Sequence, residues 1–252
     1  MIQSMIVAFS MYSKIPMPKI TWTRKNMKYA LCFFPLVGAA VALVLMSVLW
    51  VCEKAEFGTV FTAVAATLVP VLVTGGIHLD GYLDTVDALS SYGDKEKKLE
   101  ILKDSNSGAF AIIYGLVYFM ENIAVWTEIQ KEVLPFVSIS FVISRTLSGL
   151  SIATFPLAKD TGLAATFQDG AEKRTVKIVL LTLLFLEAGV CLYLHPLYGG
   201  VVLVLSLVSF GIHYDLCQRK FGGITGDLAG FFLQICELMV LAGLMLCCKI
   251  KL

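Results

Sequence analysis

Long, nearly uncharged apolar runs constrain this chain more than any other feature of its sequence. A helix needs roughly 17–25 apolar residues to cross the hydrocarbon core of a bilayer. Seven runs meet or approach that length, at residues 30–52, 59–79, 108–126, 133–155, 176–194, 197–213 and 228–248. Of the 252 residues 58% are hydrophobic and only 15% are charged, whereas a soluble domain carries about a quarter charged residues. We therefore expect an all-α, polytopic integral membrane bundle of about seven transmembrane helices, forming a single domain over residues 1–252.

The positive charges of the connections alternate from one side of the expected bundle to the other. The connections between the second and third, fourth and fifth, and sixth and seventh runs are basic, as is the segment before the first run. The alternate connections hold only Lys54 and Lys131. Because basic loops remain on the cytoplasmic side, we expect a cytoplasmic N-terminus. Lys249 and Lys251, at the opposite end, are the exception to this pattern.

The first 28 residues form a separate cytoplasmic or interfacial segment in this topology. Five apolar residues recur there at helical spacing and suit a short helix at the membrane surface: Ile2, Met5, Ile6, Phe9 and Tyr12. A flexible start of the chain is an equal alternative. The segment lacks a basic region and a cleavage site, so it does not resemble a signal peptide.

One polar stretch, residues 75–89, follows directly on the second apolar run. On a helix Asp80, Asp84 and Asp87 stand at i, i+4 and i+7 and project from one face. Their charges repel unless a cation lies among them, and Mg²⁺ is bound by one or two carboxylates together with substrate phosphates. His78 is a candidate metal ligand or proton carrier. The alternative is that these side chains only end the run and face water.

Three further segments supply candidate site residues. Lys103 and Asp104, before the third run, are a candidate phosphate contact and metal ligand, or simply the polar start of a helix. Arg145 interrupts the fourth run at a cost of roughly 2.5–3.5 kcal/mol on insertion scales. It therefore faces the interior, as a phosphate ligand or as the partner of Glu121, Glu187 or Glu237.

The third segment, residues 221–230, begins the last run. Its glycines Gly222, Gly223 and Gly226 let backbone N–H groups approach a phosphate at a helix start, and Asp227 would bind that phosphate through a bridging metal. A plain glycine turn is the alternative. Residues 155–167 form either a substrate lid or a connector.

Several classes of site and partner are not expected. The seven cysteines form no C-x-x-C pair, so neither a zinc site nor a disulfide framework is indicated. Nothing indicates a nucleic-acid partner. The candidate groups all fall on the predicted cytoplasmic side, which suits an enzyme acting on a cytosolic phosphorylated substrate better than a solute pathway.

Taken in order, these segments resemble the cobalamin synthase family, adenosylcobinamide-GDP ribazoletransferase. The resemblance is carried by Phe34-Pro35-Leu36-Val37-Gly38, by Gly75-Gly76-Ile77-His78-Leu79-Asp80-Gly81 with Asp84 and Asp87, by Lys103-Asp104, Gly108-Ala109-Phe110 and Ser144-Arg145, by Gly162-Leu163 with Phe167, and by Gly222-Gly223-Ile224-Thr225-Gly226-Asp227. Tyr82-Leu83, where smaller residues are expected, and Ala111, where glycine is common, depart from the family pattern without removing a candidate ligand.

The resemblance implies a Mg²⁺-dependent enzyme of the cell membrane with its active site facing the cytoplasm. Its substrates would be adenosylcobinamide-GDP and α-ribazole or its 5′-phosphate, and its products GMP and adenosylcobalamin or the 5′-phosphate of adenosylcobalamin. Asp80, Asp84 and Asp87, with Asp104 or Asp227, would hold the metal. His78 or a carboxylate would take the proton of the attacking hydroxyl, and Arg145 or Lys103 would steady the phosphates. A homo-oligomer or corrinoid-pathway membrane partners are compatible with this reading.

Two alternatives stay open from the residues alone. A lipid phosphotransferase of the CDP-alcohol type shares the logic of spaced aspartates, but its Asp-Gly-x-x-Ala-Arg pattern is absent after Asp80-Gly81. A metal-ion transporter would use the acidic cluster for binding, and the one-sided placement of the charges argues against it.

Overall fold

The structure is a computed structural model that describes residues 1–104 and 106–250. Within these residues it is helical, and the only β-type pairing is an isolated bridge between Leu157 and Ile224. The elements are α1 (Ile2–Tyr12), α2 (Arg24–Met27), η1 (Ala30–Phe33), α3 (Phe34–Lys54), α4 (Thr59–Thr74), α5 (Ile77–Ser90), α6 (Lys95–Ile101), α7 (Ala109–Glu128), η2 (Lys131–Val133), α8 (Leu134–Thr154), α9 (Leu163–Gly170), α10 (Lys173–Leu194), α11 (Pro196–Leu216), the π-helical turn η3 (Cys217–Phe221) and α12 (Gly226–Ile250).

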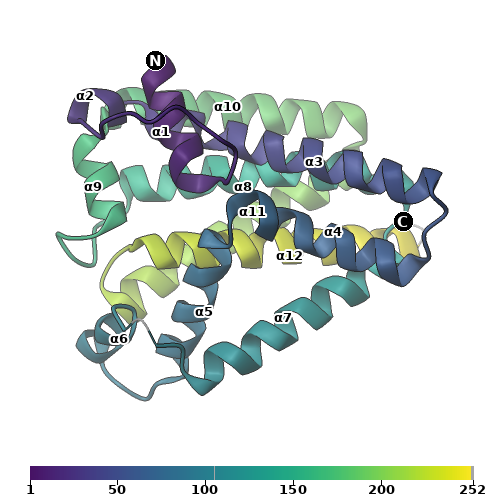
Figure 1. Cartoon of the computed structure of the whole chain (residues 1–252). Coiled ribbons are helices and arrows are strands. Elements are labelled where there is room, and N and C mark those ends of the chain that lie inside the picture. The colour runs from purple at the N-terminus through teal and green to yellow at the C-terminus, as the bar shows by residue number, and fades with distance from the viewer. Residues whose placement is uncertain (105, 251–252) are drawn as a thin grey trace.

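The long helices make this a multi-pass membrane protein. In the described part of the chain, six helical segments are long and apolar enough to cross a bilayer, or seven if the bent pair α4–α5 is counted as one span. The chain runs back and forth along one axis and its termini lie at opposite ends of the bundle (Figure 1), as an odd number of crossings requires. The predicted all-α bundle is confirmed, including the break at His195-Pro196 that separates α10 from α11.

The second predicted crossing, residues 59–79, is not one continuous helix. Helix α4 ends at Thr74, and Gly75 and Gly76 follow with φ values of +67° and +81°. Only glycine adopts this left-handed conformation at no steric cost. The two residues turn the chain by 98° into α5, so the acidic stretch forms a helix of its own at an angle to the bundle (Figure 1).

The basic connections share one end of the molecule. Figure 1 shows α2, α6 and α9 at the end opposite the C-terminus, and we call this the basic end. Two lysines at the other end are neutralised, because Lys131 pairs with Glu53 at 2.8 Å and Lys249 pairs with Glu128. Lys251 lies outside the described residues. The separation of charge fits the positive-inside pattern, while the cytoplasmic orientation itself stays a prediction.

Helix α8 is the most buried of the crossing helices and lies among α3, α10 and α12. A Cβ at Gly38 of α3 would lie 2.2 Å from the carbonyl oxygen of Phe141, so the two backbones touch there. The short helix predicted near the N-terminus is present as α1. It buries Val7, Ala8 and Tyr12 against the start of α3 rather than leaving the chain free.

Candidate active site

Helix α5 places the three predicted carboxylates on one face. Asp80 is exposed, and Asp84 and Asp87 are half-buried. The charges of Asp80, Asp227 and Asp87 all act on the Asp84 carboxyl, so Asp84 lies at the centre of the cluster. Placing four like charges around one point is unfavourable without a cation, which makes this cluster a candidate cation site.

Helix α12 brings Asp227 to this face through two glycines. A Cβ at Gly81 of α5 would lie 2.7 Å from the carbonyl oxygen of Asp227, and one at Gly230 of α12 would lie 3.0 Å from the carbonyl oxygen of His78. Larger residues at these positions would separate the helices. The backbone contact joins two segments more than 140 positions apart in the sequence and places Asp227 beside the acidic helix.

A cavity of about 90 Å³ lies where α5 and α12 meet, lined by His78, Asp80, Gly226 and Asp227 among others. His78 is buried, with its ring centroid 5.9 Å from that of Tyr12 and 5.7 Å from that of Phe34. The sequence assigned no site role to either aromatic residue. Phe34 belonged to a motif of the resemblance, whereas nothing in the sequence distinguished Tyr12 from an ordinary apolar position of its helix.

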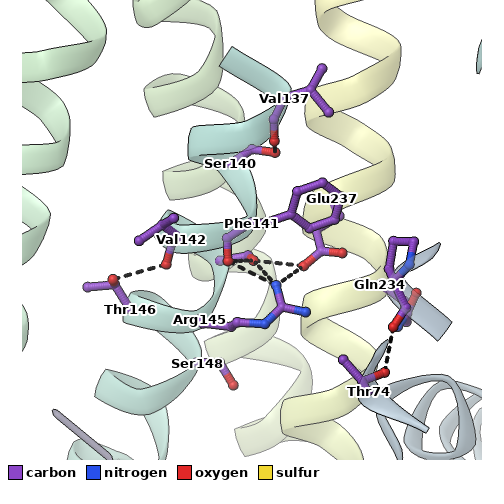
Figure 2. A network of polar contacts seen from close by, with 12 residues as sticks. Thr74, Val137, Ser140, Phe141, Val142, Arg145, Thr146, Ser148, Gln234 and Glu237 are labelled. Atoms are coloured by element: carbon purple, nitrogen blue, oxygen red, sulfur yellow. Dashed lines mark hydrogen bonds and ion pairs between the residues drawn. The ribbon is translucent and has the colours of Figure 1, made fainter. Parts of the chain in front are cut away.

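Arg145 is directed at a glutamate inside the bundle. Figure 2 shows Arg145 of α8 pointing at Glu237 of α12, with Nη1 2.7 Å from the carboxylate. The same nitrogen donates to the carbonyl oxygen of Phe141 at 2.9 Å, and Ser144 donates its hydroxyl to Glu237 at 2.8 Å. Of the three glutamates considered, Glu237 is the partner. Ser148, three residues after Arg145 on α8, lines the cavity, so the ion pair lies about one helical turn from the site. A role of Arg145 in binding phosphate stays a prediction.

Lys103 and Asp104 lie in the connection between α6 and α7. Both are exposed, and Asp104 accepts hydrogen bonds from the backbone amide and side chain of Asn106 at 2.9 and 2.8 Å. These bonds hold the pKa of the Asp104 carboxyl below its usual range. The side chain of Asp87 packs against the end of this connection, because a Cβ at Gly108 would lie 2.3 Å from the Asp87 carboxylate oxygens.

The predicted glycine loop packs against the connection between α8 and α9. Gly222 has a φ of +77°, and a Cβ at Gly223 would lie 2.4 Å from the backbone of Leu157 and Ala158. Both glycines therefore have structural reasons to be glycine. Gly226 opens α12 and lines the cavity, which leaves it the best placed of the three for an anion.

The acidic cluster offers the oxygen donors that Mg²⁺ prefers, but it does not supply a complete coordination shell. Within the described residues, no three His, Cys, Asp or Glu side chains converge tightly enough to hold a metal ion by themselves. Mg²⁺ is commonly bound by one or two carboxylates, with water and substrate phosphates completing its octahedron. Neighbouring hard oxygen donors from α5 and α12 match that mode of binding.

Comparisons with known proteins show which family this chain resembles. The family model for cobalamin-5-phosphate synthase matches residues 4–245. A protein of Lachnoclostridium phytofermentans named adenosylcobinamide-GDP ribazoletransferase is 44% identical over 94% of this chain and 91% of its own length. Proteins with the same name from Pseudomonas putida and Clostridium perfringens are 34% and 32% identical, covering 86% and 92% of this chain and 87% and 92% of theirs. No solved structure matches the chain.

The fold and the site together define a multi-pass helical membrane protein with a carboxylate cluster and a buried histidine at one end of the bundle. Since the family model covers nearly the whole chain, the protein belongs to the cobalamin-5-phosphate synthase family. Assembly of the cobalamin nucleotide loop, which the residues alone left beside two alternatives, is thereby supported over lipid phosphotransfer and ion transport.

Proposed function

We propose that this protein transfers the cobinamide-phosphate part of adenosylcobinamide-GDP to α-ribazole or α-ribazole 5′-phosphate. The products are adenosylcobalamin or its 5′-phosphate, and GMP. The observation that carries the proposal is the meeting of the acidic face of α5 with Asp227 of α12 beside a cavity, in a chain of this family.

Asp80, Asp84, Asp87 and Asp227 are the residues that would hold Mg²⁺. When bound, the ion would neutralise charge on the diphosphate of the nucleotide-activated substrate. The carboxylates are suited to this task because they come from two helices fixed by backbone contact, so their spacing does not depend on a flexible loop.

The transfer breaks the bond between the cobinamide phosphate and the GMP oxygen and forms one to a ribose oxygen of the acceptor. Since α-ribazole 5′-phosphate already carries phosphate on its 5′ oxygen, a different hydroxyl of the ribose attacks. The proton of that hydroxyl passes to His78 or to a carboxylate of the cluster. GMP leaves with the electron pair of the broken P–O bond. Tyr12 and Phe34 hold the His78 ring in place.

We place the protein in the cell membrane, with the basic end and the acidic cluster facing the cytoplasm. Three connections and the N-terminal segment, all rich in lysine and arginine, support this orientation. A nucleotide-activated substrate made in the cytosol then reaches the cavity from the aqueous side.

A reaction with purified components tests the proposal. The protein in nanodiscs is supplied with adenosylcobinamide-GDP, α-ribazole 5′-phosphate and Mg²⁺, and GMP and the corrinoid product are quantified by chromatography. GMP should appear in equal amount to the new corrinoid, and only when all three components are present. Absence of both products from a correctly folded preparation would refute the proposed reaction.

A further inference from the structure

The connection between α8 and α9 carries a lysine that reaches the acidic site. Residues 155–158 are fixed to the glycine loop by two backbone hydrogen bonds: Ile224 donates to the carbonyl oxygen of Pro156 at 2.8 Å, and Ala158 donates to that of Ile224 at 3.1 Å. Lys159 follows immediately after this bridge, and Asp227 lies three residues beyond Ile224. The bridge therefore holds Lys159 near the start of α12.

The environment of Lys159 differs from that of the other lysines in the described part of the chain. It alone is partly buried while making neither an ion pair nor a hydrogen bond there. Lys28 is similarly buried but pairs with Glu172, and Lys98 donates to the carbonyl oxygen of Gly93. The stem of Lys159 is thus partly covered by protein while its ammonium group remains available for an anionic partner.

The side chain of Lys159 lies beside the segment that lines the cavity. Its Cε would lie 3.7 Å from a Cβ at Gly162, and the next two residues, Leu163 and Ala164, line the cavity with Asp227. The charge of Lys159 also acts on the Asp227 carboxyl. Lys159 thus lies at the edge of the site, on the α8–α9 connection near the start of α12.

We propose that Lys159 is a binding residue for the diphosphate of the nucleotide-activated substrate, an inference that rests on the proposed function. Four carboxylates repel a diphosphate, and a metal ion shared among them offsets only part of that repulsion. A lysine ammonium acts as a point charge on phosphate oxygens. From the α8–α9 connection it supplies the positive charge that the acidic face of α5 lacks.

Binding of GDP, the nucleotide part of the activated substrate, is the direct test. GDP with Mg²⁺ is titrated calorimetrically into the protein in nanodiscs. Lys159→Ala should raise the dissociation constant about tenfold, which corresponds to 1.4 kcal/mol, and Lys159→Arg should restore most of the affinity. Lys177→Ala, at an exposed lysine of the same end without an ion pair, should bind like the wild type.

The outcomes separate this inference from the proposed function. Wild-type affinity in a folded Lys159→Ala variant would overturn the role of Lys159 and leave the reaction untouched. A wild-type protein that neither binds GDP nor releases GMP would overturn both. Thermal unfolding without ligand verifies that each variant is folded, and Lys159→Gln replaces Lys159→Ala in the titration if the alanine variant is unstable.

Discussion

At the scale of single residues, the structure separates two aspartates that the sequence left as alternatives. Asp227 lies beside Asp84, whereas Asp104 is exposed and bonded to Asn106 within its own turn. We predict that Asp227→Asn lowers the rate of GMP release by about 10²-fold or more, the usual effect of losing one electrostatic stabiliser. Asp104→Asn should stay within a few-fold of wild type. Equal losses in the two variants would contradict the separation.

The ion pair between Arg145 and Glu237 leads to a second prediction. Both side chains are buried, so Glu237→Gln leaves the Arg145 guanidinium as an uncompensated buried charge. Breaking one partner of such a pair costs about 3–5 kcal/mol. We expect a clearly lower unfolding temperature in detergent for Glu237→Gln, and recovery in the double variant Arg145→Met/Glu237→Met.

The double variant also distinguishes the two roles of Arg145. A stable double variant that fails to release GMP would assign Arg145 a role toward the substrate in addition to its structural one. An unfolding temperature of Glu237→Gln equal to wild type would show that the pair does not stabilise the bundle.

At the scale of elements, the approach of α5 to α12 is the contact that assembles the site. Gly81→Ala would place a methyl group 2.7 Å from a backbone oxygen of Asp227, and overpacking of this kind costs about 1–3 kcal/mol. We predict loss of most GMP release and a lower unfolding temperature. Gly189→Ala on α10, where a Cβ meets nothing within 4 Å, is the matched control and should keep both. Normal activity of Gly81→Ala would show that the helices tolerate separation.

The lengths of the apolar runs predicted the crossing helices well, because a helix that crosses lipid needs a long apolar stretch. The limits of α8 and α12 differ from prediction by only one or two residues. The break after Thr74 was missed because residues 75–79, Gly-Gly-Ile-His-Leu, contain no Asp, Glu, Lys or Arg that would end the apolar run. In the sequence, Gly75 and Gly76 are as compatible with a flexible segment as with a sharp turn. The direction of α5 depends on packing against α12.

At the scale of the whole molecule, the orientation in the membrane is open to direct measurement. Tyr92 is fully exposed at the basic end, and Phe57 is exposed in the connection between α3 and α4 at the other end. We predict that a cysteine replacing Phe57 reacts with a membrane-impermeant maleimide in intact cells, whereas one replacing Tyr92 reacts only after permeabilisation. The reverse pattern would invert the topology and place the site outside the cytoplasm.

The site was predicted in part. Asp80, Asp84 and Asp87 could be identified because three carboxylates at helical spacing lie together on any helix. Asp227 was predicted to join them only as an alternative to Asp104, since only the folded chain brings α12 to α5. Tyr12, Phe34 and Lys159 come from three separate segments, and no spacing rule relates them. Residues gathered by tertiary packing carry no local signal in a single sequence.

Asp84 lies at the centre of the acidic cluster, so its replacement is the most direct test of the proposed cation site. GMP release from adenosylcobinamide-GDP is measured for wild type, Asp84→Asn and Glu96→Gln, the last an exposed carboxylate of the same end. We predict that Asp84→Asn folds normally but loses at least about 10²-fold in the rate of GMP release. Glu96→Gln should remain fully active. Full activity of Asp84→Asn would contradict the claim that this carboxylate cluster holds the cation that the reacting diphosphate requires.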